Sequence, residues 1–276
     1  MGGERRPIGV FDSGVGGLTV LSALRRALPR DDFIYLGDTA RLPYGTKSAA
    51  TVQRYSLQCA AALRRRGIGC LVVACNTASA SSLDALRLAH PDLPVIGVIE
   101  PGAAAAVAAS ATQRIAVIGT ESTIGGGAYQ RAIARLSPAA VVTARACSLF
   151  VALAEEAWTE GPIVEAIVHR YLDPLFAAEH APDTLVLGCT HFPLLTAALR
   201  AALPPTVSLV DSAATTARAV VERIAIEWTH SAGDGTDAAT GRITWLATDD
   251  VARFARVGGR FFGATLREQA VEVIDL

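Results

Sequence analysis

The fold of this chain is decided by a short stretch, Leu71-Val72-Val73-Ala74-Cys75-Asn76-Thr77. Its uninterrupted apolar run is typical of a parallel strand that is buried on both faces. A cysteine and two hydrogen-bonding side chains follow the run, and the segment after them reads as a helix over Ser82–His90. The stretch therefore predicts a strand, a polar turn that carries a thiol, and a helix.

The same alternation of short β-branched runs and longer helical segments continues along nearly the whole chain. It is the signature of βαβ units and predicts parallel sheets whose strands are buried on both faces. The expected strands are Ile8–Phe11, Phe33–Leu36, Leu71–Ala74, Val95–Val98, Ile115–Ile118, Val141–Ala144, Leu185–Leu187, Ser208–Val210 and Ile243–Leu246. The expected helices are Leu18–Leu28, Ala49–Arg66, Ser82–His90, Gly127–Leu136, Ile163–Glu179, Leu194–Leu203 and Ala213–Trp228.

Two internal echoes suggest that the chain holds two related α/β halves. The stretch at 71–77 resembles Leu185-Val186-Leu187-Gly188-Cys189-Thr190-His191, and Val10-Phe11-Asp12-Ser13 resembles Leu209-Val210-Asp211-Ser212. Similarity this short also arises by chance, because a strand followed by a polar turn is common. The polar segment 231–237 reads as an exposed loop.

Composition excludes several classes of protein. The chain has 276 residues, of which 51% are hydrophobic and 18% charged, so it is able to bury a large core as one large or two modest domains. Its 25 basic and 26 acidic residues give a net charge of -1, which argues against nucleic acid or an anionic membrane as a partner. Its longest apolar stretch, 96–120, is interrupted by charged residues and proline, so no membrane span is expected. Lys47 is the single lysine, which leaves little scope for pyridoxal phosphate chemistry.

The five cysteines are an odd number, and no apolar leader precedes them. We therefore expect reduced thiols and a cytoplasmic location. Cys59, Cys70 and Cys147 read as buried packing residues. Cys75 and Cys189 differ, because each follows a strand at the point where ligands bind in parallel sheets and where a helix N-terminus lowers the pKa of a thiol.

Other polar segments frame these two thiols. The glycine-rich turn Asp12–Thr19 departs from nucleotide-binding fingerprints. The Asp12 carboxylate suits an ammonium group or a proton-handling partner. The alternative is that Asp12 only caps the first helix. His191 directly after Cys189-Thr190 is a candidate acid, whereas the spacing fits neither a zinc site nor a cysteine protease. Two equivalent thiols suit the inversion of a stereocentre, which needs a base on one face of a carbon and an acid on the other.

Several segments together resemble the bacterial glutamate racemases, and the resemblance covers essentially the whole chain. These segments are Gly9–Leu18, Asp38-Thr39 with Pro43-Tyr44-Gly45, Ala74–Ser79, Glu100–Gly102, Val117–Thr120, Gly188–Pro193 and Val210–Ala213. The resemblance implies interconversion of L- and D-glutamate without cofactor or metal, which supplies D-glutamate for peptidoglycan. It also implies two similar parallel-sheet α/β domains that face each other across a cleft, the first comprising 1–98 plus 210–276 and the second 99–209.

The roles of individual residues follow from the same resemblance. Cys75 works on the D-enantiomer and Cys189 on the L-enantiomer, with Asp12 and His191 as their respective auxiliary groups. The carboxylates and ammonium of the substrate are held by Asp12, Ser13, Tyr44, Gly45, Asn76, Thr77, Thr190 and His191, assisted by Thr120 and Thr123. An acidic residue after Leu149-Phe150-Val151 completes the set. Glu155 is favoured, while Glu156 or a surface salt bridge stays open.

The sequence departs from the family pattern at two positions. Ala152 and Ala157 stand where the resemblance implies proline and glycine in many relatives, so the second half is expected to differ in shape from theirs. The resemblance further implies a homodimer. The rival interpretations are a racemase for aspartate or a hydantoin and, since some proteins of this family inhibit DNA gyrase, a regulatory protein. Nothing in the sequence supports the second rival.

Overall fold

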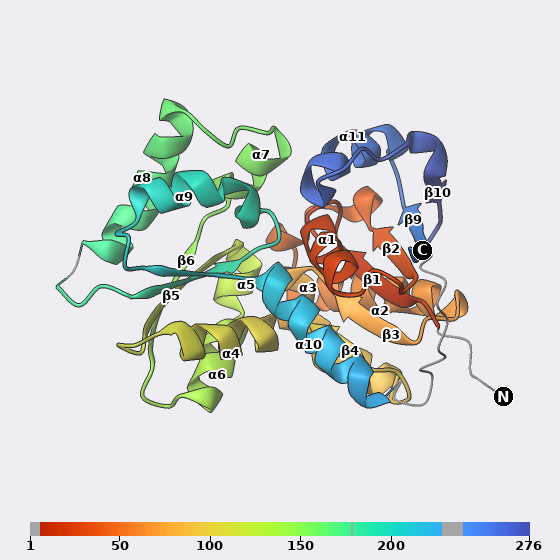
Figure 1. Cartoon of the computed structure of the whole chain (residues 1–276), viewed down its shortest axis with the longest axis horizontal. Helices are drawn as coiled ribbons and strands as arrows, with labels where there is room; N and C mark the ends of the chain where they lie inside the picture. The colour runs from red at the N-terminus through yellow and green to blue at the C-terminus, as the bar shows by residue number, and fades with distance from the viewer. Residues whose placement is uncertain (1–5, 178, 228–239) are drawn as a thin grey trace.

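The computed structural model describes residues 6–177, 179–227 and 240–276, which form two parallel sheets covered by helices (Figure 1). The first sheet has the order β10-β9-β2-β1-β3-β4, and its strands are β1 (Ile8–Asp12), β2 (Phe33–Gly37), β3 (Cys70–Val73), β4 (Val95–Gly97), β9 (Ile243–Ala247) and β10 (Val271–Val273). The second has the order β6-β5-β7-β8, with strands β5 (Arg114–Gly119), β6 (Val141–Ala146), β7 (Thr184–Gly188) and β8 (Ser208–Asp211). Every pairing is parallel, so the predicted fold class is confirmed.

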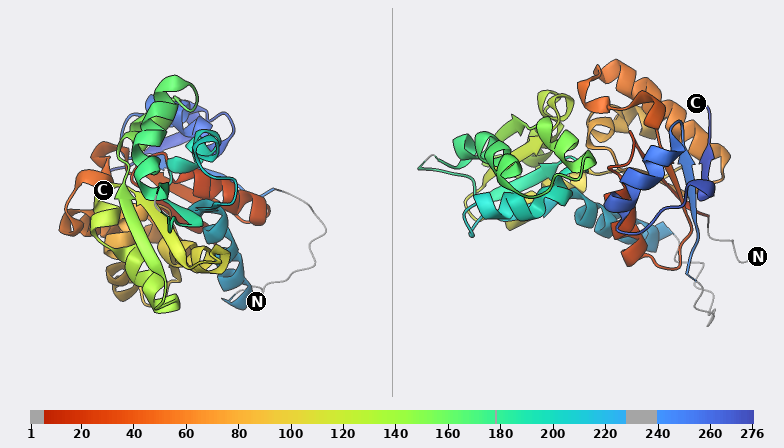
Figure 2. Two further views of the ribbon diagram at one scale, coloured as in Figure 1. Left: turned by 90° about the vertical axis from the view of Figure 1, so that its left-hand side faces the viewer. Right: turned by 90° about the horizontal axis from the view of Figure 1, so that it is seen from above.

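The helices fill the intervals between the strands. They are α1 (Leu18–Ala27), α2 (Ala49–Arg65), α3 (Asn76–Ala89), α4 (Ile99–Ala109), α5 (Glu121–Gly125), α6 (Ala128–Leu136), α7 (Leu149–Glu155), α8 (Pro162–Phe176), α9 (Thr196–Ala202), α10 (Ser212–Glu227) and α11 (Val251–Phe262). Figure 2 shows the segment that contains the second sheet, green to teal, beside the segments of the first sheet, which come from both ends of the chain. No helix in the described ranges is long and apolar enough to cross a membrane.

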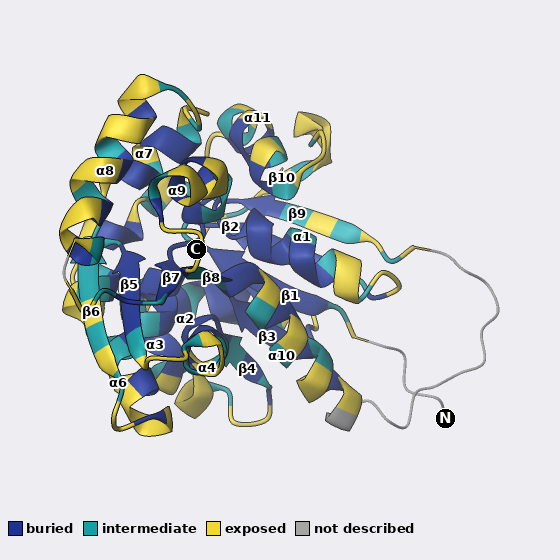
Figure 3. Ribbon diagram, turned by 60° about the vertical axis from the view of Figure 1, so that its left-hand side comes forward, coloured by how far each residue is buried: buried dark blue, intermediate teal, exposed yellow. Residues whose placement is uncertain are grey.

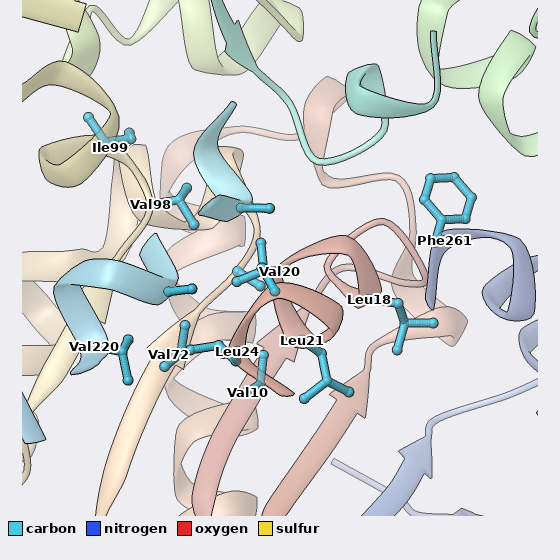
Figure 4. Packing of buried hydrophobic residues seen from close by; sticks show 14 of the residues in the cluster. Val10, Leu18, Val20, Leu21, Leu24, Val72, Val98, Ile99, Val220 and Phe261 are labelled. Carbon is cyan, nitrogen blue, oxygen red and sulfur yellow. The ribbon is translucent and has the colours of Figure 1, made fainter. Parts of the chain in front are cut away.

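The central strands are buried because alternate side chains enter two different hydrophobic clusters. Val10 and Val72 pack with α1 and α10 on one face of the first sheet, whereas Phe11 and Val73 pack with α2 and α3 on the other. Figure 4 shows the cluster that contains Val10 and Val72. Figure 3 colours the ribbon by burial and shows the central strands of both sheets in the dark blue of buried residues. Burial on both faces is the reason that these strands read as continuous apolar runs.

The chain crosses between the two sheets twice. The first crossing lies between β4 and α4. The second lies between β8 and α10, because β8 pairs with β7 in the second sheet whereas α10 packs on α1 beside the first. The predicted boundary between 209 and 210 therefore falls inside a paired strand. We propose that the first domain resumes at Ser212, where α10 begins.

Several local expectations need correction. The helix expected from Ser82 begins at Asn76, directly after Cys75, and the predicted strands miss β10. The predicted helices miss α4, α5, α7 and α11. Trp228 and the polar segment 231–237 lie outside the described residues. Burial on both faces is wrong for β6, where Val141 and Thr143 are exposed, because β6 is an edge strand of the second sheet. It is also wrong for β9, where Thr244 is exposed.

The two sheets can be compared strand by strand. The order β2-β1-β3-β4 corresponds to β6-β5-β7-β8, so Cys75 after β3 and Cys189 after β7 occupy equivalent places. The second similarity, between Val10–Ser13 and Leu209–Ser212, does not mark equivalent positions in the two sheets. Asp12 ends the central strand β1, whereas Asp211 ends the edge strand β8. The position of a strand in a sheet depends on pairing across long sequence distances, which four similar residues do not encode.

Candidate active site

A cavity of about 260 Å³ collects residues that follow the carboxyl ends of strands in both sheets. Parallel α/β sheets bind ligands at this edge. The cavity is lined by Ser13, Leu42, Pro43, Tyr44, Gly45, Thr46, Cys75, Asn76, Thr77, Thr120, Ser148, Val151, Ala152, Glu155, Cys189, Thr190 and His191. Of the residues singled out in the sequence, Asp12 and Thr123 are absent from this lining and are fully buried next to residues that belong to it.

Cys75 stands at the N-terminal end of α3, where its side chain caps the helix. The Ala78 amide donates to Sγ at 3.5 Å, and Sγ donates to the Ser13 hydroxyl at 3.7 Å. Burial and the nearby Asp12 carboxylate raise the pKa of the Cys75 thiol to about 12, which outweighs the amide and the hydroxyl. The lowered pKa expected for a thiol at a helix N-terminus is therefore wrong for Cys75, which is a proton donor in the resting cavity.

Asp12 is the carboxylate nearest to this thiol, and one of its oxygens is unused. Oδ2 accepts the Gly14 amide at 2.9 Å, while the buried Oδ1 has no partner in the described part of the chain. Burial raises the pKa of Asp12, opposed by the charge of His191 and by the backbone amides of Gly17, Gly14 and Ser13. A buried carboxylate with a free oxygen is suited to take up and return a proton.

Cys189 has a different neighbour, the imidazole of His191. Sγ lies 3.8 Å from Nδ1, and Nε2 lies 3.1 Å from Oε1 of Glu155. Burial lowers the pKa of His191, but the hydrogen bonds to Cys189 and Glu155 outweigh burial and raise the pKa to about 10. The ring is therefore an imidazolium near neutral pH, and it places a positive charge beside the Cys189 thiol.

Glu155, at the end of α7, is the acidic residue that reaches the cavity. Its Oε2 accepts from Nη2 of Arg253 at 2.7 Å, and the ion pairs with His191 and Arg253 outweigh burial and lower its pKa. Glu156, which the sequence left open, is exposed at the C-terminal cap of α7. Geometry therefore places Glu155, and not Glu156, in contact with His191.

The polar wall of the cavity consists of amides and hydroxyls. Asn76 accepts a hydrogen bond from the Tyr129 hydroxyl through Oδ1 at 2.8 Å, and its buried Nδ2 has no partner among the described residues. Thr77, Thr120 and Thr123 form a triangle of hydroxyls with separations of 3.0 to 3.2 Å. An unpaired amide donor and adjustable hydroxyls suit the recognition of a carboxylate.

Tyr44 and Gly45 form another part of this wall, in an unexpected way. The Tyr44 hydroxyl donates to Asp38, which also accepts two hydrogen bonds from Arg41, so this hydroxyl is already engaged within the wall. At Gly45 an added Cβ would lie 2.8 Å from Cβ of Thr120, so only glycine permits this close approach. Pro43 precedes this segment in a cis peptide bond.

The three remaining cysteines are buried, as expected for packing residues, and no cysteine of the chain forms a disulfide. Burial raises the pKa of Cys147 to about 12. Cys59 lies 3.9 Å from the Tyr44 hydroxyl, so it packs behind the cavity wall. The described residues include no group of three or more His, Cys, Asp or Glu side chains that could hold a metal ion.

Two residues in contact with the site escaped sequence reasoning. Arg253 comes from α11 and Tyr129 from α6, and neither lies near a recognised motif. The strong amphipathic pattern of Val251–Phe262 signals the helix α11. No local pattern signals which side chain Arg253 contacts.

Comparisons with known proteins agree with this geometry. The family model described as "Asp/Glu/Hydantoin racemase" matches residues 8–220. A glutamate racemase of Geobacter metallireducens is 50% identical over 262 residues, which cover 95% of this chain and 94% of that protein. The crystal structure of glutamate racemase from Francisella tularensis in complex with D-glutamate has a TM-score of 0.87 and 34% identity, covering 98% of both chains. A glutamate racemase isoform of Bacillus anthracis has a TM-score of 0.90 and 35% identity, covering 99% of both chains. The chain therefore belongs to the Asp/Glu/hydantoin racemase family and is a racemase, an enzyme of the isomerase class.

Proposed function

We propose that this protein interconverts L- and D-glutamate by proton transfer between two thiols, without a cofactor. The observation that carries the proposal is the placement of Cys75 and Cys189, which follow equivalent strands of the two sheets and line one cavity. The names of its relatives supply the substrate, since relatives that cover nearly the whole chain are called glutamate racemases. The cavity, of about 260 Å³, suits a small amino acid.

The reaction takes a proton from one face of the α-carbon and returns another to the opposite face. Starting from L-glutamate, the Cys189 thiolate takes the α-proton as the C–H bond breaks, and the electron pair remains on the α-carbon. The Cys75 thiol then donates its proton to the other face, which gives D-glutamate and leaves Cys75 as the thiolate. The reverse reaction exchanges the two roles.

The surroundings of each thiol fit these roles. The imidazolium of His191 stabilises the negative charge of Cys189 as a thiolate, whereas burial beside Asp12 keeps Cys75 protonated. In this scheme Asp12 relays a proton on the Cys75 side, and Glu155 holds His191. Nδ2 of Asn76 and the hydroxyls of Ser13, Thr77, Thr120 and Thr190 bind the carboxylates. Tyr44 and Gly45 complete the wall, and the buried Thr123 supports it through its hydrogen bonds to Thr77 and Thr120.

The test is proton exchange with solvent. L-glutamate incubated with the enzyme in deuterated buffer, with no added cofactor, should lose optical rotation and gain deuterium at the α-carbon. L-aspartate is the matched comparison. A much faster reaction with L-aspartate would overturn the substrate assignment, and retained rotation in glutamate would overturn the activity.

The proposal extends to cellular role and setting. D-glutamate from this reaction would supply peptidoglycan synthesis, and we propose a cytoplasmic location because two working thiols must stay reduced. The homodimer stays a prediction, which light scattering on the purified protein would test. Gyrase inhibition has no support in the site, and a supercoiling assay with and without the protein would separate it from catalysis.

A further inference from the structure

Helix α11 packs with the first sheet, yet three of its side chains contact the cluster beside Cys189, and one of them, Arg260, donates from Nη1 to the backbone oxygen of Glu155 at 3.4 Å. Arg253 Nη2 donates to Glu155 Oε2 at 2.7 Å, and the Phe261 ring meets the His191 ring edge to face at a centroid distance of 5.0 Å. These two residues are eight positions apart and therefore lie on one face of the helix. Figure 1 shows α11 and α7 side by side where the two parts of the molecule meet.

The carboxylate of Glu155 divides its two oxygens between the two parts of the molecule. Oε1 bonds to His191, which follows β7 of the second sheet, and Oε2 bonds to Arg253. The Glu155 side chain is 18% exposed and that of Arg253 is 38% exposed, so water screens the pair less than it screens an ion pair on the open surface. With both oxygens engaged, the carboxylate is fixed in one orientation.

We propose that Arg253 is a positioning residue for racemisation, because by anchoring Glu155 it holds the His191 ring in place against the Cys189 thiol. The inference rests on the proposed function and goes beyond it. Arg253 belongs to the part of the chain that packs on the first sheet, so the acid partner of Cys189 is complete only while α11 is docked on α7. The His191 ring is therefore held against the Cys189 thiol only while the two parts of the molecule are docked.

The charges around His191 show why the effect is confined to one thiol. Cys189 faces the ring from its own segment, Glu155 from α7, Asp12 from β1, and Arg253 from α11. Without Arg253 the carboxylate is free to turn away from His191, and the charge beside Cys189 loses its fixed place. The hydrogen-bond partners of Cys75 are the Ser13 hydroxyl and the Ala78 amide, and its nearby carboxylate is Asp12, so α7 and α11 supply none of these groups.

The experiment uses Arg253→Gln in the full chain, with Arg256→Gln as control, because Arg256 is an exposed arginine on the same helix. The equilibrium constant of a racemisation is one, so kcat/KM falls equally in both directions, and we expect a loss of about tenfold. The diagnostic measurement is the primary isotope effect on kcat/KM with α-deuterated substrates. It should rise for L-glutamate, where Cys189 breaks the labelled bond, and fall towards one for D-glutamate. Arg256→Gln should match the wild type.

Isotope effects that stay at wild-type values, or that change equally for the two enantiomers, would overturn the inference. A purely structural role of Arg253 lowers the melting temperature or the amount of active enzyme without moving either isotope effect. Arg253→Lys keeps the charge but loses the planar fork, so it should give intermediate values and serves if the glutamine variant does not fold. A wild-type enzyme without activity on glutamate would instead refute the proposed function itself.

Discussion

Cys75 and Cys189 occupy equivalent places in two similar sheets, but the groups around them differ in kind. Cys75 is surrounded by an uncharged hydroxyl, a backbone amide and the buried carboxyl of Asp12. Cys189 is next to the His191 imidazole, which bonds to the Glu155 carboxylate, and that carboxylate bonds in turn to Arg253. The two halves of the site thus share a backbone arrangement and differ in electrostatics. Equivalent strands place the thiols, while the neighbouring elements supply different charged groups around each of them.

The strongest test asks whether both thiols are indispensable. Cys75→Ala and Cys189→Ala should each reduce racemisation by at least roughly 10²- to 10⁴-fold, since each removes an acid or base from one face of the substrate. Polarimetry on glutamate measures the loss. Cys147→Ala, a buried cysteine outside the cavity lining, is the control that should keep most of the activity. One alanine variant with substantial activity would break the two-thiol scheme.

The next test separates the auxiliary groups of the two halves. Asp12→Asn and His191→Asn should each lower kcat/KM by about 10²-fold, because each removes one proton-handling group. Their isotope effects should move in opposite senses: His191→Asn raises the effect for α-deuterated L-glutamate, and Asp12→Asn raises it for the D-enantiomer. Variants that shift both enantiomers together would show that the halves do not act separately.

The pH dependence of stability sharpens the same contrast. The pKa of His191 is raised from 6.5 to about 10 in the folded protein, so its stabilising contribution is full below pH 6.5 and is lost as pH rises through about 10. Between pH 6.5 and about 9 the free energy of unfolding should fall by on the order of 3 kcal/mol. The Cys75 thiol, whose pKa is raised from 9.0 to about 12, contributes only above that window. Urea titrations of His191→Asn should show a flatter dependence, and an unchanged slope would contradict the assignment.

A smaller effect is expected at the amide of Asn76. Tyr129→Phe removes the hydroxyl that fixes Oδ1, a hydrogen bond worth about 1 kcal/mol, so KM for glutamate should rise about fivefold with kcat little changed. Both enantiomers should be affected alike, because the carboxylate site serves both. Tyr171→Phe, on α8, is the matched control. A fall in kcat at constant KM would show that Tyr129 acts in another way.

The smallest effect on activity should come from the end of α7. Ala157 has φ of 59°, in the left-handed region that favours glycine, which the family resemblance also implies at this position. Ala157→Gly should therefore raise the free energy of unfolding by about 1 kcal/mol, visible as a higher melting temperature, while glutamate turnover stays within about twofold. A lower melting temperature would show that the alanine is not strained.

Local sequence was sufficient for the features that depend on neighbouring residues. The strands β1, β3 and β7 are continuous apolar runs, and each thiol follows its strand directly, so both could be located without a structure. The family resemblance then identified the polar residues that line the cavity. The edge strand β6 and the false echo between Asp12 and Asp211 show the limit, because sheet position depends on distant pairing.

The contacts that tune the site lie beyond that limit. Arg253 and Glu155 are 98 residues apart, and Tyr129 and Asn76 are 53 apart. Each pair joins side chains that packing of the two parts brings together, and neither residue type is unusual at its position. The choice between Glu155 and Glu156 also depends on packing between distant parts of the chain. Adjacent residues on a helix point in different directions, and only the packing of α7 decides which of the two faces His191.

The hydroxyls of Thr77, Thr120 and Thr123 form a triangle of hydrogen bonds whose direction is not fixed by the protein alone. Each hydroxyl donates one proton and accepts another, so a closed triangle can run in either rotational sense. A carboxylate that accepts a hydrogen bond from one hydroxyl fixes the orientation of the other two, and polarisation along the hydrogen-bonded hydroxyls strengthens each bond in turn. Because Thr77 precedes the first crossing of the chain and the other two follow it, a carboxylate bound to one of these hydroxyls would reorient hydroxyls in both parts of the molecule.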